Sequence, residues 1–263
     1  MSIQGKLPVN RFKQALQEGR QQIGLWHSLA SPLAAEVTAG AGADWLLLDG
    51  EHSPLGAEGM LSLLQAVERH GAAPVVRPLW HDALQFKQLL DLGVMNLLVP
   101  NVRSAAEAQR CVDFAHYPPR GSRGMASGVV RASQFGRITD YVERIGDELC
   151  IVVQVETQAG LDALEEIAAV EGIDGVFFGP ADLAADIGLA GKAAHPDVVR
   201  RVEEGLRRTR SAGKAAGVLT VDEVLVRRYQ AAGSVMTAVG LDVHLLARAT
   251  EAAVQRYRGV APD

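Results

Sequence analysis

Side chains able to do chemistry follow several short apolar runs of this 263-residue sequence. Asp49, Glu51 and His52 stand at the end of the run WLLLDGE, and Arg77 lies in the next run, PVVRPL. Later runs end in a further set of polar residues, which comprises Gln154, Glu156, Thr157, Asp182, Thr220 and Asp242. Acids, a histidine, an arginine and an amide are groups that can hold a cation, move a proton and stabilise an anion. Brought together by the fold, they would form an active site.

Glu156 and Asp182 are the carboxylates that we expect to bind a metal ion. They end two separate apolar segments, VQVET and GVFFGPAD, so they could meet across one end of a sheet. Hard oxygen ligands suit Mg²⁺ or Mn²⁺, and two protein ligands leave positions for water and substrate oxygens. The structural alternative is that Asp182 begins a helix and that Glu156 pairs with an arginine.

His52 and Arg77 are candidates for proton transfer and for anion stabilisation. Histidine titrates near neutral pH, which suits a general base, although His52 could instead bond to a loop carbonyl. Arg77 lies in an apolar strand, and a buried arginine requires an anionic partner. That partner is either a structural carboxylate or the carboxylate or enolate of a substrate, and the position near a strand end favours the substrate.

The positions of the lysines bear on how a carbanion could be stabilised. A carbon–carbon lyase can use a lysine Schiff base or a metal that holds an enolate. None of the five lysines stands where an apolar run ends; they are Lys6, Lys13, Lys87, Lys192 and Lys214. For such chemistry the sequence therefore favours a metal.

The apolar runs predict the elements that must position these residues. They are short and apolar nearly throughout, as strands of a parallel sheet buried on both faces are. The eight runs lie at 23–29, 45–51, 74–79, 96–102, 150–157, 175–180, 215–220 and 234–240. Helical segments lie between them, and Ser31 and Ser104 are expected N-caps. Eight βα units in a chain of this length predict an α/β protein with a closed (β/α)8 TIM barrel, whose chemistry collects at the carboxyl ends of the strands.

A doubly wound open sheet is the alternative architecture. The first run is followed by ASPLAAE, without the glycine-rich turn typical of that fold. No composition shift marks a boundary, so we expect one domain over residues 1–263. The segment 117–147 is too long for an ordinary loop, and we interpret it as an excursion after the fourth helix with a short helix near 139–145.

Composition restricts the partners and the compartment. Lysine and arginine total 26 against 31 aspartates and glutamates, a net charge of −5, which argues against a nucleic-acid partner. Cys111 and Cys150 have no metal-binding or disulfide spacing around them. No segment reaches the ~18 apolar residues of a membrane span. The sequence predicts a cytoplasmic protein that acts on a small-molecule substrate.

Several motifs in their order resemble the HpcH/HpaI family of class II pyruvate aldolases. The resemblance extends from about residue 10 to 259 and rests on IGLWHSL, DWLLLDGEHSP, PVVRP, QLLDLG, YPPRGSRG, VQVET, VEGIDGVFFGPADL and AVGLD. It implies an aldehyde-lyase that uses Mg²⁺, Mn²⁺ or Co²⁺ to split 4-hydroxy-2-oxo acids into pyruvate and an aldehyde. RASQFGRITDYV resembles members acting on 4-hydroxy-2-oxoheptanedioate, in the breakdown of aromatic compounds, more than those acting on 2-dehydro-3-deoxyglucarate.

The resemblance also implies roles for individual residues. His52 matches the catalytic base, Asp91 the acid that raises its basicity, and Arg77 the transition-state stabiliser. The implied metal ligands are Glu156 and Asp182, and the implied substrate-binding positions are Gln154, Ala181, Asp182, Trp26 and Asp49. The resemblance further implies a homo-oligomer, typically a hexamer, in which the last helix, at 245–257, packs onto a neighbouring barrel.

Two departures and three rival functions stay open at this stage. His27 and Asn101 replace residue types usual in the family and could reshape the pocket, although His27 could equally be exposed or capped and inert. The rival functions are a sugar-acid aldolase, an acyl-CoA thioester lyase and a barrel that binds a ligand without catalysis.

Overall fold

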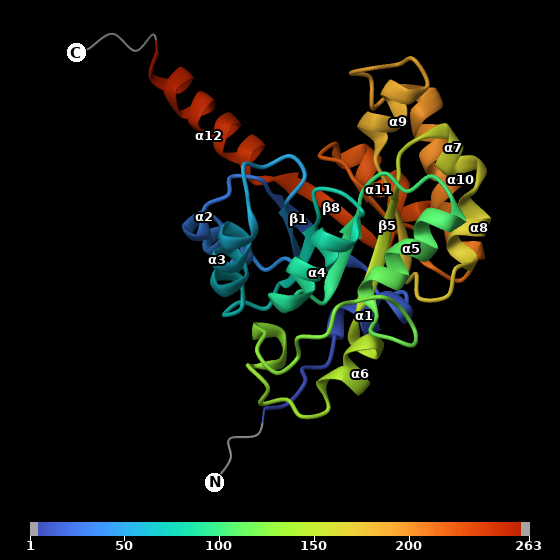
Figure 1. Cartoon of the computed structure of the whole chain (residues 1–263). Helices are drawn as coiled ribbons and strands as arrows, with labels where there is room; N and C mark the ends of the chain where they lie inside the picture. Colours follow the sequence, from blue (N-terminus) through green and yellow to red (C-terminus); the bar gives the residue numbers. More distant parts are fainter. Residues whose placement is uncertain (1–4, 259–263) are drawn as a thin grey trace.

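Eight parallel strands close into a barrel in sequence order, with β8 beside β1, in the computed structural model, which describes residues 5–258 (Figure 1). The strands are β1 (Gln22–His27), β2 (Trp45–Asp49), β3 (Ala73–Arg77), β4 (Asn96–Val99), β5 (Cys150–Val155), β6 (Gly175–Phe178), β7 (Ala215–Leu219) and β8 (Met236–Leu241). Each overlaps a predicted run, so the predicted TIM barrel is confirmed and the open sheet is excluded.

One helix precedes the first strand and one follows the last, and those between return the chain to the start of the next strand. They are α1 (Arg11–Gln17), α2 (Pro32–Ala39), α3 (Ala57–Val67), α4 (Ala83–Asp91), α5 (Ala105–Ala115), α6 (Tyr141–Glu148), α7 (Gln158–Asp162), α8 (Leu164–Ala169), α9 (Pro180–Asp186), α10 (Pro196–Ser211), α11 (Glu223–Ala231) and α12 (Asp242–Tyr257). The predicted caps are confirmed: the Ser31 hydroxyl accepts from the amide of Ala34, and that of Ser104 accepts from the amide of Glu107.

Two hydrophobic layers explain why the strands are apolar throughout. Trp45 and Leu47 of β2 point into the barrel, where they join Phe177 from β6. Leu46 and Leu48, one residue further along, pack in the layer between the strands and the helices. Because successive side chains of a strand point to opposite faces, both faces must be apolar. The layers hold the carboxyl ends of all eight strands at one end of the barrel.

The excursion at 117–147 lies at the other end of the barrel, near α1 (Figure 1). It carries a 3-10 turn (Arg131–Ser133) and α6, so the predicted short helix is confirmed with its start at Tyr141. Arg123 anchors this segment: it is buried, and its guanidinium lies 4.5 Å from the ring centroid of Tyr117. The segment is therefore part of the scaffold rather than of the barrel mouth.

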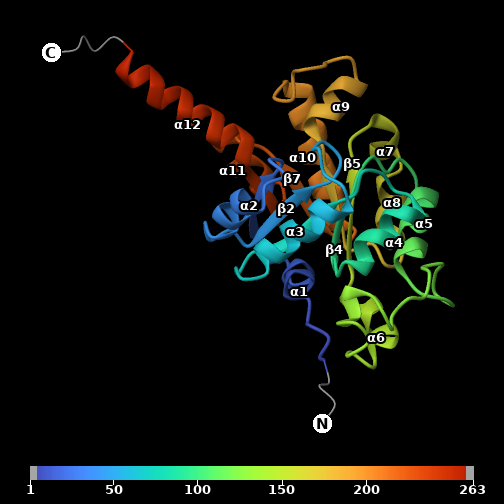
Figure 2. The same cartoon turned by 60° about the vertical axis from the view of Figure 1, so that its left-hand side comes forward.

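The last helix, α12, projects away from the barrel in both views (Figures 1 and 2). Apart from Asp242 at its start, its side chains are not buried, and Leu245, Leu246, Val254 and Tyr257 are exposed apolar residues. None of the helices within residues 5–258 is long and apolar enough to cross a membrane.

Candidate active site

Asp49 and Arg77 form a buried ion pair at the carboxyl ends of β2 and β3. Arg77 donates from Nε to Oδ1 of Asp49 at 3.0 Å and from Nη2 to Oδ2 at 2.7 Å. The indole of Trp26 donates to the same Oδ2 at 3.1 Å, and Nη1 of Arg77 lies 2.8 Å from Oε2 of Glu51. Arg77 therefore has structural carboxylate partners, and these hold its guanidinium rigidly at the mouth.

Charge compensation sets the protonation of Asp49. Burial by itself raises the pKa of this carboxyl, but the hydrogen bond and charge of Arg77, with the donors Trp26 and the Glu51 amide, outweigh burial and lower the pKa below its usual value. Asp49 is thus a carboxylate across the neutral pH range.

Glu156 lies in the opposite electrostatic setting at the end of β5. Its carboxylate accepts from Nε2 of Gln154 at 2.5 Å and from the amide of Asn101 at 3.0 Å, and it forms no ion pair with an arginine among residues 5–258. Burial, followed by the negative charges of Asp182 and Glu51, raises its pKa to about 8. The structural alternative for Glu156 is therefore wrong, and its surroundings need positive charge.

Asp182 reaches the same cavity from the first turn of α9. It lies within the helix rather than capping it, because the N-cap is Gly179. A Cβ on Gly179 would lie 2.4 Å from Oε2 of Glu156, so this corner approaches the glutamate as closely as it does only because the residue is glycine. Glu156 and Asp182 both line a cavity of about 280 Å³, together with Glu51, His52, Asn101, Arg103, Thr157 and Asp186.

The residues of this cavity fit a divalent cation. Glu156 and Asp182 are hard anionic ligands, and their mutual repulsion is what a cation would relieve. Oε1 of Gln154, beside Glu156, is a buried acceptor with no partner in the described part of the chain. Since residues 5–258 contain no group of three or more His, Cys, Asp or Glu placed to hold a metal, a cation bound here would keep positions for water or substrate.

A second cavity of about 230 Å³ opens beside the first, at the centre of the barrel mouth. The predicted substrate-binding residues Trp26, Asp49, Gln154 and Ala181 line it, as does Arg77, and His52 and Asp182 line both cavities. Phe177, Leu219 and Leu241 give it a largely apolar wall. The fold thus brings together all but one of the predicted site residues.

His52 stands at the edge of both cavities with its side chain 69% exposed. Its backbone amide donates to Oδ1 of Asp49 at 3.3 Å, which fixes the loop after β2. The closest charged group to its ring is Glu51, with 3.9 Å between Nε2 and Oε2. The imidazole is therefore free to meet a substrate.

Asp91 is the predicted site residue that the chain does not bring to the mouth. It ends α4, which runs back from the carboxyl end of β3, so it lies at the opposite end of the barrel from His52. Its Oδ1 accepts from Nη2 of Arg123 at 2.9 Å. Within one chain a helix length separates Asp91 from His52, so the expectation that Asp91 raises the basicity of His52 stays a prediction.

Asp242 and His27 form a second pair that the sequence did not indicate. Asp242 was expected at the mouth with a possible role in chemistry, but its Oδ2 lies 2.7 Å from Nδ1 of His27, and both are buried. Asp242 also accepts from the amides of Ser28 and Leu29. The pair joins the end of β1 to the start of α12, and His27 lines neither cavity, so His27 is buried structure rather than an exposed residue.

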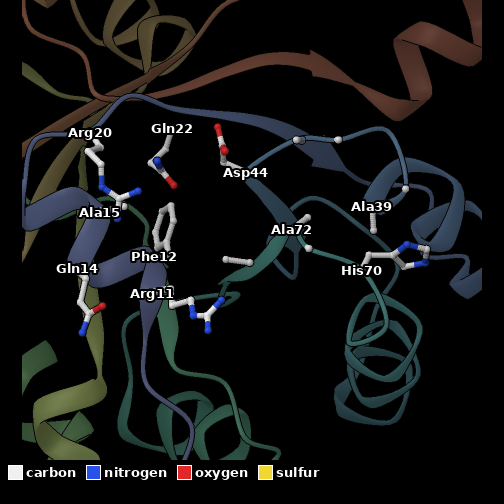
Figure 3. Close-up of a pocket in the computed structure, with 15 residues that line it drawn as sticks. Arg11, Phe12, Gln14, Ala15, Arg20, Gln22, Ala39, Asp44, His70 and Ala72 are labelled. Carbon is white, nitrogen blue, oxygen red and sulfur yellow. The ribbon is translucent and has the colours of Figure 1, made fainter.

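The lysines and a larger cavity elsewhere in the barrel support the choice of site. None of the lysines lines either cavity at the mouth. A larger cavity of about 590 Å³ lies at the amino ends of the strands, where Gln22, Asp44 and Ala72 line it (Figure 3). It contains neither the predicted ligands nor the predicted base, and in this fold chemistry takes place at the other end.

Comparison with known proteins places this barrel with its acidic mouth in a class. Residues 22–249 match the family model of the HpcH/HpaI aldolase/citrate lyases. A crystal structure of an HpcH/HpaI aldolase/citrate lyase family protein from Burkholderia cenocepacia J2315 superposes with a TM-score of 0.91 at 38% identity, covering 95% of this chain and 100% of that chain.

Curated relatives are closer in sequence. A 4-hydroxy-2-oxo-heptane-1,7-dioate aldolase of Shigella sonnei is 50% identical over 248 residues, which cover 94% of this chain and 95% of the relative. A hydroxypyruvate/pyruvate aldolase of Pseudomonas aeruginosa is 49% identical over 256 residues, or 97% of this chain and 96% of the relative. The chain belongs to the HpcH/HpaI aldolase/citrate lyase family, and the expectation that it is an enzyme of the aldolase class is confirmed.

Proposed function

We propose that this chain is a metal-dependent class II aldolase that reversibly cleaves 4-hydroxy-2-oxo acids, with 4-hydroxy-2-oxoheptanedioate as the leading substrate. The products are pyruvate and an aldehyde, here succinate semialdehyde, as in the breakdown of aromatic compounds. The observation that carries the proposal is that Glu156 and Asp182 face one cavity, with His52 and Arg77 beside it. A divalent cation such as Mg²⁺, Mn²⁺ or Co²⁺ held by these two carboxylates would supply the positive charge that stabilises an enolate.

The chain's own residues account for the movement of protons and charge. His52 removes the proton of the C4 hydroxyl, the C3–C4 bond breaks, and the electron pair of that bond becomes the enolate of pyruvate. C4 leaves as the aldehyde, and protonation of C3 completes pyruvate. Arg77, held by Asp49, stabilises the negative charge on the enolate oxygen without reorganising, because its position is set before the substrate binds.

The remaining walls bind and orient the substrate. Gln154 and Ala181 line the central cavity beside the two carboxylates, where the 2-oxo acid would lie. Trp26 and Phe177 give this cavity an aromatic wall, with 6.0 Å between their ring centroids. Apolar surroundings strengthen the interaction between Arg77 and the developing charge.

An assay of the proposed reaction tests this assignment directly. Protein treated with EDTA is incubated with pyruvate and succinate semialdehyde, alone and with each of Mg²⁺, Mn²⁺ and Co²⁺. We expect the aldol product only with a divalent ion. Product formation that is indifferent to EDTA, or no product with any aldehyde of a panel, would contradict the proposal.

The Pseudomonas aeruginosa relative supports a second candidate for the nucleophile. Its name includes hydroxypyruvate, and its identity to this chain is almost equal to that of the heptanedioate aldolase. The same assay with hydroxypyruvate in place of pyruvate decides which 2-oxo acid gives the higher kcat/KM.

We also propose that the active enzyme is a homo-oligomer, with a hexamer as the expected state. The exposed apolar side chains of α12 support packing of this helix onto a neighbouring barrel, since an isolated helix of this kind gains little stability in water. His52 is exposed and Asp91 is distant from it in one chain, so Asp91 could act on His52 only across a subunit boundary. A cytoplasmic location is part of this proposal and rests on two buried, unpaired cysteines.

Mixed oligomers test the role of Asp91. His52→Ala and Asp91→Asn chains are inactive or weak alone, but together they would rebuild some sites with His52 from one chain and Asp91 from another. We expect the mixture to exceed the sum of the separate activities. If the mixture after subunit exchange has only the sum of the separate activities, Asp91 does not act on His52 of another subunit.

A further inference from the structure

A positively charged side chain, Arg103, lines the acidic cavity that contains the proposed metal ligands. Arg103 follows β4 and lines this cavity opposite carboxylates that include Glu156, Asp182 and Asp186. Arg77, the other arginine of the mouth, is already compensated by Asp49 and Glu51. Arg103 forms no ion pair with a carboxylate within residues 5–258 and is exposed, so its charge is available to a ligand.

Asn101 orients this guanidinium. Nε of Arg103 donates to Oδ1 of Asn101 at 2.9 Å, while the amide of Asn101 donates to Oε1 of Glu156 at 3.0 Å. Asn101 has a φ of +56°, a left-handed conformation that asparagine tolerates better than most residues. One residue therefore connects the buried glutamate to the exposed arginine and fixes their relative position.

The backbone of Arg103 is held as well. Its amide donates to Oε2 of Glu107 at 2.7 Å, and Ser104 caps α5 by accepting from the amide of Glu107. The arrangement is similar to a capping box, except that Glu107 accepts from the residue before the N-cap, and it fixes the entry of the chain into the helix. Arg103 thus extends from a rigid corner rather than from a loose loop.

We propose that Arg103 is a specificity-determining residue that binds the distal carboxylate of the substrate and so selects aldehydes that carry an acid group. The inference rests on the proposed function, which places the 2-oxo acid end of the substrate at Glu156 and Asp182 and the C4 hydroxyl at His52. From there the aldehyde portion extends from the buried end of the cavity to its rim. Arg103 lies at that rim, and its two terminal guanidinium nitrogens, which have no hydrogen-bond partner within residues 5–258, match a carboxylate.

Two aldehydes that differ in charge test the proposal. Succinate semialdehyde carries a carboxylate, and its methyl ester, methyl 4-oxobutanoate, has the same chain without the charge. The variant is Arg103→Met, which keeps an unbranched side chain and removes the guanidinium and its charge. The control is Arg227→Met, an exposed arginine of α11 that lines neither cavity. Each protein is assayed with pyruvate and a divalent ion.

The expected result is a loss of preference rather than a loss of activity. Arg103→Met should lower kcat/KM for succinate semialdehyde on the order of tenfold, mostly through KM, and leave the ester within about twofold. Arg227→Met should leave both unchanged. An equal effect on both aldehydes, or no effect on either, overturns the proposal. Failure of the wild-type protein to react with any aldehyde would instead overturn the proposed function.

Asn101→Gly separates positioning from binding. Glycine keeps the backbone amide that contacts Glu156 and accepts the left-handed conformation, but it removes the oxygen that orients Arg103. We expect the same shift in preference between the two aldehydes, at a smaller size than in Arg103→Met, with the activity on the ester retained. An unchanged preference would show that Asn101 does not position Arg103.

Discussion

Two sides of the barrel mouth differ in how they treat negative charge. On the side of β2 and β3, Asp49 and Glu51 surround the guanidinium of Arg77, and the pKa of Asp49 is lowered. On the side of β5 and β6, Glu156 accepts hydrogen bonds from the amides of Gln154 and Asn101, and its pKa rises to about 8. Both sides are acidic in sequence, yet within residues 5–258 only the carboxylates of the first side form an ion pair with an arginine.

The difference separates two tasks that one site must perform. A compensated cluster is rigid and ready, since its hydrogen bonds are satisfied before the substrate arrives. An uncompensated pair costs free energy until a cation binds, and this makes it a selective site for one. The same residue types therefore give a preorganised arginine on one side and a proposed metal site on the other.

Removal of a carboxylate from the uncompensated side should have the largest effect. Glu156→Gln leaves the shape of the cavity and deletes a ligand charge, so we expect activity to fall by about three orders of magnitude or more. Binding of Mn²⁺ should be lost as well, and it is measured by the rise in Tm that Mn²⁺ causes. Asp186→Asn is the matched control, because it lines the same cavity without being a proposed ligand. Retained Mn²⁺ binding in Glu156→Gln would show that the metal does not bind at Glu156.

Removal of the Arg77 guanidinium from the compensated side should have the next largest effect. Arg77→Met removes the counter-ion of the buried Asp49 and the partly buried Glu51, so we expect a loss of about 3–5 kcal/mol of stability. The value of kcat should fall about 10²–10³-fold, while Mn²⁺ binding persists. Denaturant unfolding and steady-state kinetics measure the two effects. A variant that turns over at the wild-type rate would mean that Arg77 is only structural.

A methyl group at Gly179 should act on the uncompensated side alone. The Cβ of Gly179→Ala would lie 2.4 Å from Oε2 of Glu156, so the glutamate or the corner of α9 must shift. We expect affinity for Mn²⁺ to fall about tenfold, with the Asp49–Arg77 pair and the fold intact. Calorimetric titration with Mn²⁺ measures the effect, and unchanged affinity would show that the corner adapts.

The smallest effect expected is a dependence of stability on pH in metal-free protein. The folded protein holds the proton of Glu156 to about pH 8, whereas an unfolded glutamate releases it near 4.5. Folded protein thus binds more protons than unfolded protein between these values, and stability falls as pH rises through this window. The Tm of Glu156→Gln should lack this decline, and so should wild type saturated with Mn²⁺. Parallel curves for all three samples would contradict the raised pKa.

The barrel architecture and most of the residues at its mouth could be predicted from the sequence alone. Short runs that are apolar throughout and alternate with helical segments predict strands buried on both faces, and the polar residues at their ends then share one end of the barrel. Glu156, Asp182, His52 and Arg77 were placed in this way. Asp91 ends α4, so within one chain it lies away from His52, and a motif match carries no information about contacts between subunits.

Tertiary structure decided how these residues are paired, because pairing depends on distances that strand spacing does not encode. Arg77 forms ion pairs with Asp49 and Glu51, whereas Glu156 forms none within residues 5–258. His27 pairs with Asp242 at the start of α12. Tertiary structure also turned Arg103 toward the acidic cavity through Asn101. Residue types set what chemistry is possible, but a pKa and a partner follow from burial and neighbours, and only the folded chain supplies these.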